Sequence, residues 1–228
     1  MADLPFEIPD YLKARFEADL RREYASEPLF DYYELSLFKW HLQETENLNK
    51  RMHDAALQYI REQVDNDVDI VNDSGMLPVE YFYRRVRYSD VVFMVSLLES
   101  LLEKACMRLR QLLPRVDMPE NFSGGKWRGP QQFLERYGEV QTPENLWEPV
   151  KRLIDVRNLI VHDNGSAEPL GDDGRKELSK CAGLSIKGGR VEVSPEYVER
   201  AIDDIELLIQ HYEEGIRQTV ERADSELK

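Results

Sequence analysis

The sequence predicts a mainly α-helical bundle with a long N-terminal helix and one small β-hairpin before the C-terminal helix. Three observations lead to this fold class. Apolar residues recur at helical spacing through several long segments, proline and glycine separate those segments, and a single short stretch alternates as strands do. With 228 residues, 42% of them hydrophobic, the chain can bury a full core without a disulfide or metal staple.

The first predicted helix follows Pro28 and runs toward residue 64, where Asp65-Asn66-Asp67 breaks it. Its apolar stripe contains Phe30, Tyr33, Leu37, Trp40, His41, Leu48, Met52, Ala55, Tyr59 and Ile60. Because the outer face is charged, this stripe needs a groove or a partner helix. We expect residues 1–76 to form a helical extension that packs on a core of residues 77–222.

The core is predicted to begin with a second long helix, from Val79 to Leu113. This helix is apolar around most of its circumference between residues 91 and 109, which is typical of the central helix of a bundle. Residues 117–130 contain two prolines and three glycines and predict a loop, followed by a short helix near residues 131–137. Thr142 as N-cap and Pro143 in the first turn predict the start of a third main helix, which Gly165 is placed to end.

The last third of the chain holds the predicted hairpin. Residues 164–174 are rich in glycine and aspartate and predict a loop. Residues 184–187 and 190–193 alternate around Gly188-Gly189, which is a hairpin signal. Ser194-Pro195 then starts a final helix that carries apolar residues as far as Tyr212.

Composition narrows the class of protein. The longest apolar run, residues 91–95, is far shorter than the roughly 20 residues of a membrane span, and the acidic N-terminus lacks the features of a signal peptide. The two cysteines, Cys106 and Cys181, form no disulfide framework and no CxxC motif. The sequence therefore predicts a soluble, cytoplasmic protein.

Charge is distributed unevenly. The formal net charge is −14, yet residues 104–157 contain ten basic and seven acidic side chains. One interpretation is a solvated face, and the other is a local anion site on a chain that otherwise repels RNA. For the second interpretation, the candidate substrate-binding residues are Arg108, Lys126, Arg128, Lys151 and Arg152.

Several familiar sites are not supported by their spacing. No histidine has a glutamate three residues before it, and no HExxH is present, so His41 and His53 are interpreted as packing or surface residues and no metal is expected. The segment 123–127 resembles a phosphate loop, but Trp127 stands where Ser or Thr is required. Cys106 is predicted to be a buried small residue. No cofactor is expected.

One constellation carries chemistry. Arg157, Asn158 and His162 stand near the end of the third main helix, just before a polar exit that contains Gly165. An arginine can hold a phosphate and stabilise charge that grows on its oxygens. A histidine can take the proton of a 2′-hydroxyl or give one to a departing 5′-oxygen near neutral pH. These are the side chains needed to cleave RNA without a metal ion.

At this motif the sequence resembles the HEPN superfamily, whose members carry Arg-x(4–6)-His with a polar residue after the arginine. The match is Arg157-Asn158-x-x-x-His162, and the resemblance extends over residues 79–212, with the bundle helices, the motif and the closing helix in the family's order. It implies a helical homodimer in which two motifs face each other in a composite site. It also implies a metal-independent endoribonuclease of a toxin–antitoxin or phage-defence system, with an RNA substrate and a nucleotidyltransferase-like antitoxin. Arg157 would contact phosphate, Asn158 would orient, and His162 would act as acid or base.

Helix geometry limits how these side chains meet. At 100° per residue, Arg157 lies on the apolar stripe, whereas Asn158 and His162 lie about 140° to 180° from Leu153. Three arrangements would reconcile them: the helix unwinds before His162, Arg157 reaches around, or a second protomer completes the site. A structural role is the alternative, with Arg157 anchored to carbonyls or to an acid such as Glu99 or Glu103, and His162 capping the helix. The rival function is a non-catalytic dimerisation or interaction module.

Overall fold

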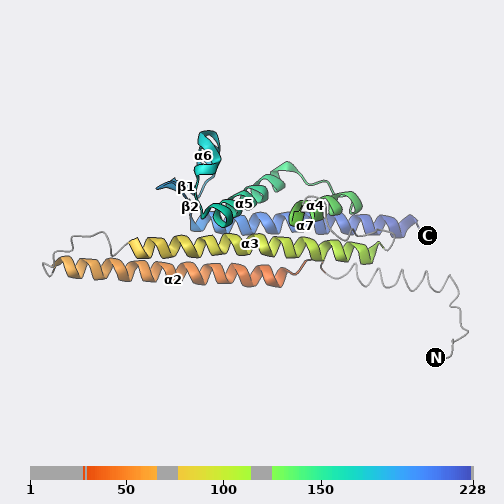
Figure 1. Cartoon of the computed structure of the whole chain (residues 1–228). Helices are drawn as coiled ribbons and strands as arrows, with labels where there is room; N and C mark the ends of the chain where they lie inside the picture. Colours follow the sequence, from red (N-terminus) through yellow and green to blue (C-terminus); the bar gives the residue numbers. More distant parts are fainter. Residues whose placement is uncertain (1–27, 29, 66–76, 114–124, 227–228) are drawn as a thin grey trace, which may run out of the picture. The chain divides into compact units, whose positions relative to one another are not determined.

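The computed structural model describes residues 28, 30–65, 77–113 and 125–226 (Figure 1). They form six α-helices, one short 3-10 helix and one two-stranded antiparallel sheet, which confirms the mainly α fold with a hairpin before the last helix. The described residues group into two compact units. One contains residues 32–98 and 143–208, and the other contains the described parts of residues 1–31, 99–142 and 209–228. The predicted division between residues 76 and 77 lies at the edge of residues outside the description and stays a prediction.

In the first unit, α2 (Tyr32–Asp65) packs beside the beginning of α3 (Leu77–Leu112) (Figure 1). The Tyr83 hydroxyl donates a hydrogen bond to the Asn49 carbonyl, and Arg87 Nε lies 3.1 Å from Glu46 Oε1. Both helices were predicted within three residues of their observed ends. The buried face of α2 was not predicted. It consists of Leu35, Phe38, Leu42 and Asn49, none of which belongs to the predicted stripe. Most of the predicted stripe is exposed.

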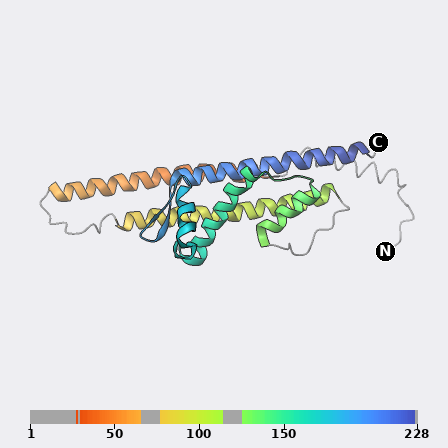
Figure 2. The same cartoon turned by 90° about the horizontal axis from the view of Figure 1, so that it is seen from above.

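Helix α5 (Glu144–Asp163) belongs to the same unit and runs obliquely to α2, as Figure 2 shows. The predicted cap at its start is wrong: Pro143 is the N-cap in an extended conformation, and no side chain caps the helix. Thr142 instead donates a 2.5 Å hydrogen bond to Glu135 and shares one of 2.6 Å with the Tyr212 hydroxyl. Because the Thr142 hydroxyl makes these hydrogen bonds, it does not cap the first N–H groups of α5.

The segment after α5 is more ordered than the sequence predicts. The predicted loop over residues 164–174 contains the 3-10 helix η2 (Glu168–Leu170) and the start of α6 (Gly171–Lys180). Helix α6 has a single buried residue, Leu178, and therefore no apolar periodicity to reveal it. Asp172 and Asp173 in its first turn and Lys180 in its last suit the helix dipole, and Arg175 Nε donates to the Ala167 carbonyl at 2.9 Å.

The hairpin forms where it was predicted. Strands β1 (Leu184–Lys187) and β2 (Arg190–Val193) pair antiparallel, with Lys187 opposite Arg190 across the turn. Gly188 and Gly189 both have positive φ, as a tight two-residue turn of this kind requires. The backbone N–H of Val191 donates to the Gly165 carbonyl, so the hairpin adjoins the end of α5.

The second unit is built from the remainder of α3, from α4 (Gly125–Tyr137) and from the later part of α7 (Pro195–Glu226). Helix α4 begins six residues before the predicted start and includes Pro130, which was placed in a loop. Gly129 and Pro130 are buried, and the Cys106 thiol donates to the Pro130 carbonyl, so packing outweighs the local preference of these residues. The prediction that Cys106 is buried is confirmed.

Candidate functional site

Helix α5 carries the whole Arg157, Asn158 and His162 motif without interruption, since it ends only at Asp163. Unwinding before His162 is therefore excluded. Five residues of regular α-helix separate the directions of Arg157 and His162 by about 140°. Two of the three arrangements remain: Arg157 reaches around the helix, or a second protomer supplies the missing partner.

Arg157 is half-buried and partly committed. Its Nη1 donates a 3.1 Å hydrogen bond to Asn158 Oδ1, so the polar neighbour in the motif orients the guanidinium. Its Nε is buried and has no hydrogen-bond partner among the described residues. An arginine offers five N–H donors, and leaving a buried one unused is costly. Arg157 therefore retains donor capacity that an acceptor could satisfy.

His162 is exposed in the last turn of α5. The helix ends there because Asn164 and Gly165 both adopt positive φ and both donate their backbone N–H to the Leu159 carbonyl. A side chain added at Gly165 would lie 2.1 Å from the Tyr88 hydroxyl oxygen. The predicted role of Gly165 in ending the helix is confirmed, and it fixes the backbone that follows His162.

Two arginines that the sequence did not single out converge two residues beyond His162. Arg85 Nη1 donates to Asn164 Oδ1 at 2.9 Å, and Arg190 Nη1 donates to the Asn164 carbonyl at 2.5 Å. The Arg85 guanidinium also lies over the Tyr81 ring, 5.0 Å from its centroid. Neither arginine forms an ion pair with a described residue.

This pair of arginines has no signature in the sequence. Arg85 is 79 residues before Asn164, and Arg190 is 26 residues after it. Their meeting depends on α3 and the hairpin both reaching the end of α5, which is a tertiary arrangement. The hairpin signal was visible, but no pattern indicated that Arg190, at the start of β2, would contact Asn164. Cations here suit the negative end of the helix dipole, and the unpaired charge is also available to an anion.

The predicted substrate-binding residues are distributed over three helices, α3, α4 and α5. On α5, Lys151 Nζ lies 3.3 Å from Glu148, and Arg152 Nη1 donates to Cys181 Sγ at 3.4 Å, a hydrogen bond that raises the pKa of Arg152. Arg108 and Arg128 belong to the other compact unit, where Arg108 Nη1 donates to Gln111 at 3.4 Å. The side chain of Lys126 lies outside the description. The substrate-binding role of these five residues stays a prediction.

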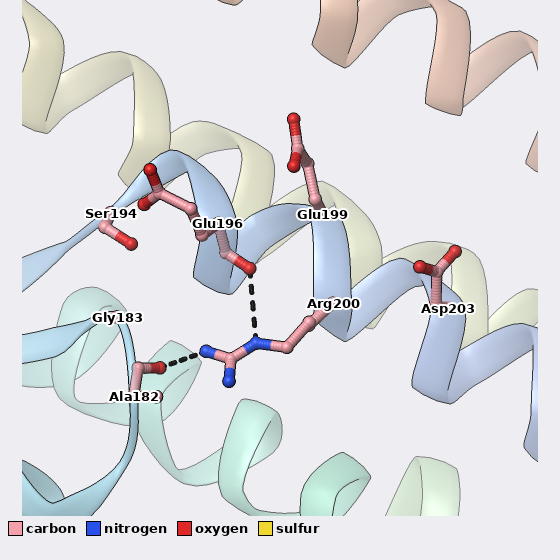
Figure 3. Close-up of a pocket in the computed structure, with 7 residues that line it drawn as sticks. All are labelled: Ala182, Gly183, Ser194, Glu196, Glu199, Arg200 and Asp203. Atoms are coloured by element: carbon pink, nitrogen blue, oxygen red, sulfur yellow. Dashed lines mark hydrogen bonds between the residues drawn. The ribbon is translucent and has the colours of Figure 1, made fainter.

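An open pocket of about 480 Å³ lies beside the start of α7 (Figure 3). Its lining residues are Ala182, Gly183, Ser194, Glu196, Glu199, Arg200 and Asp203. Arg200 donates to the carbonyls of Ala182 and Glu196, so its side chain links the segment before β1 to the first turn of α7. The other charged residues of the lining are acidic, and the pocket contains no member of the motif.

Within the described ranges, no three or more His, Cys, Asp or Glu side chains are grouped closely enough to hold a metal ion. A search of the described helices likewise finds none with the length and apolar character of a membrane span. Comparison of the chain with known protein families, with characterised proteins and with solved structures finds no match.

Proposed function

We propose that this chain is a HEPN-like, metal-independent endoribonuclease of a toxin–antitoxin or phage-defence system. The observation that carries the proposal is the position of His162, which is exposed and two residues from the asparagine that Arg85 and Arg190 both contact. An acid–base group beside cations without carboxylate partners suits a phosphodiester.

The reaction is attack by the 2′-oxygen of RNA on the adjacent phosphorus. A base removes the 2′-hydroxyl proton, the bond from phosphorus to the 5′-oxygen breaks, and an acid protonates the departing oxygen. The products are a 2′,3′-cyclic phosphate and a 5′-hydroxyl. His162 serves as base when neutral or as acid when protonated. Arg157 holds the phosphate oxygens, and Asn158 keeps its guanidinium oriented.

A second protomer completes this site in the proposal. Because Arg157 and His162 point about 140° apart on one regular helix, a single α5 does not aim both at one linkage. In a homodimer, His162 of one copy can face Arg157 of the other. The protein would act in the cytoplasm on RNA, and a nucleotidyltransferase-like antitoxin would hold it inactive.

The test is cleavage of RNA by the purified full chain in excess EDTA. We expect cleavage to persist in EDTA and to leave 2′,3′-cyclic phosphate ends, and His162→Ala to lower the rate at least about 100-fold. His53→Ala, which removes an imidazole from α2 instead, is the matched control and should stay within about twofold. Equal cleavage by wild type and His162→Ala, or none by either, would contradict the proposal that the chain is an endoribonuclease.

A second candidate function is a non-catalytic dimerisation or interaction module. The specific observation that favours it is the set of large apolar side chains exposed along α2. Monomeric soluble proteins seldom expose this many large apolar side chains on one helix unless they bind a partner. Absence of RNA cleavage together with stable self-association would select this function over the first.

A further inference from the structure

Helix α2 has an apolar face on each of two sides. The inner face is buried, and polar contacts fix it to its neighbours: Arg87 to Glu46 at 3.1 Å, and Lys39 Nζ to Asp203 at 2.8 Å. The outer face is exposed over about seven helical turns. Its large side chains, which we call the outer stripe, are Tyr33, Leu37, Trp40, Leu48, Met52 and Tyr59.

The outer stripe follows one side of the helix. At 100° per residue, its six members fall within a sector about 120° wide, and they extend about 40 Å along the helix axis. Trp40 is 61% exposed and Tyr59 is 63% exposed, so most of the surface of each residue is open to solvent in a single chain. Isolated apolar residues on a surface are ordinary, but six large ones along one side of a helix indicate an interface.

Two opposite charges lie within the same sector. Glu44 and Arg51 are both exposed, and neither forms an ion pair with a described residue. Arg51 Nε donates only to the Asn47 carbonyl of its own helix, at 3.3 Å. The partner of this surface therefore has to offer apolar side chains together with a cation opposite Glu44 and an anion opposite Arg51.

A second copy of α2, running antiparallel, offers this pattern. In a two-fold antiparallel pair, residues whose numbers share a constant sum lie opposite each other. A sum of 95 to 96 places Leu37 opposite Tyr59, Trp40 opposite Ala55, and Leu48 near its own copy at the centre. The same register places Glu44 of each copy opposite Arg51 of the other, on the same side of the contact.

We propose that the chain self-associates through the outer stripe of α2, antiparallel and centred near Leu48. A parallel pairing in register is disfavoured because it would set Glu44 against Glu44 and Arg51 against Arg51. The antiparallel arrangement makes two Glu44–Arg51 pairs, one on each side of the symmetry axis, along the same edge of the apolar contact. The inference does not rest on the ribonuclease proposal, since the contact involves α2 alone and charge reversals at Glu44 and Arg51 test it.

The experiment measures the mass and dissociation constant of the full chain by sedimentation. We expect wild type to be a dimer, and Glu44→Arg or Arg51→Glu to raise the dissociation constant at least tenfold, because symmetry repeats each like-charge contact. The double variant Glu44→Arg/Arg51→Glu should return to within about threefold of wild type. Lys50→Glu, which makes the same charge change well outside the stripe sector, should leave the dimer intact.

Other outcomes overturn the inference. A monomeric wild type at high concentration would mean that the outer stripe does not pair. A dimer that ignores both single charge reversals would place the contact on a different surface. Single variants that dissociate without rescue by the double variant would reject the antiparallel register. Circular dichroism of each variant checks that its helices are retained, and Trp40→Ala should dissociate the dimer without altering any charge.

Discussion

At the scale of single residues, Asp90 of the first unit is a carboxyl group buried in the core. It lies on α3, is only 6% exposed, and its pKa is raised to about 6 by burial. His41 and Arg87 nearby oppose that rise, and Glu46 adds to it. A carboxyl group whose folded pKa exceeds its ordinary value binds its proton more tightly in the folded state. Ionised Asp90 therefore costs stability above pH 6, and protonation recovers that stability as the pH falls toward 4.

Asp90→Asn should stabilise the protein in a pH-dependent manner. The asparagine is neutral at every pH, so its advantage over wild type should reach about 3 kcal/mol at most at pH 8 and should vanish below about pH 4. The measurement is the difference in free energy of unfolding between the two proteins from pH 4 to pH 8, with urea as denaturant. Asp172→Asn, at an exposed position on α6, is the control. A difference that stays constant across this range would contradict the assignment.

The residues of the motif illustrate what a sequence reveals at this scale. The end of α5 was predictable, because Gly165 tolerates a positive φ that few side chains adopt. A second constraint on Gly165 was not predictable from the sequence. The ring of Tyr88 fills the space where a side chain at this position would stand. The same holds for Asn164, whose two arginine contacts come from α3 and β2. The backbone conformation at the end of α5 depends on neighbouring residues, whereas these contacts depend on residues that are distant in the sequence.

At the scale of elements, periodicity predicted the long helices and the hairpin but not α6. Helices α2 and α3 have apolar rows long enough to stand out, and β1 and β2 alternate around two glycines. Helix α6 is polar except for Leu178, so nothing in its composition separates it from a loop. On α2 the sequence revealed an apolar row without revealing that a second face, through Leu35, Phe38 and Leu42, would be the buried one. A helix with two apolar faces does not indicate by itself which face its own chain covers.

In the second unit, close packing of α7 against the segment after α4 depends on Gly215. A Cβ there would stand 2.3 Å from Cγ2 of Val140, and the nearby Thr219 hydroxyl donates to the Gly138 carbonyl at 2.6 Å. Val140 is itself buried, so it has little room to move. The glycine weakens the helix locally but lets the Val140 side chain approach the backbone.

Gly215→Ala should therefore destabilise the protein by about 1–3 kcal/mol, although alanine favours a helix by about 1 kcal/mol over glycine. The clash with Val140 is the expected cause, and Val140→Ala would remove it. In a double-mutant cycle measured by thermal or urea unfolding, the two changes should be less destabilising together than the sum of their separate effects. Strict additivity would show that the two side chains do not compete for the same space.

At the scale of the whole molecule, net charge opposes both of the interactions proposed. Each copy carries a formal charge of −14, so two copies repel each other, and each copy repels RNA. Local features have to overcome this field: the outer stripe of α2 in self-association, and Arg85, Arg157 and Arg190 in phosphate binding. The two interactions differ in the kind of contact that drives them. The first buries mainly apolar surface, and the second pairs cations with phosphates.

Salt should therefore move the two interactions in opposite directions. The screening length falls from about 10 Å at 0.1 M to about 3 Å at 1 M, which removes repulsion between copies, whereas two exposed Glu44–Arg51 pairs contribute at most about 1 kcal/mol each. Raising NaCl from 0.1 to 0.5 M should tighten the dimer severalfold in sedimentation. The same change should weaken RNA binding, because the release of counterions from RNA is less favourable at higher salt. If added salt dissociates the dimer instead, charge pairs and not the apolar side chains of α2 hold the two copies together.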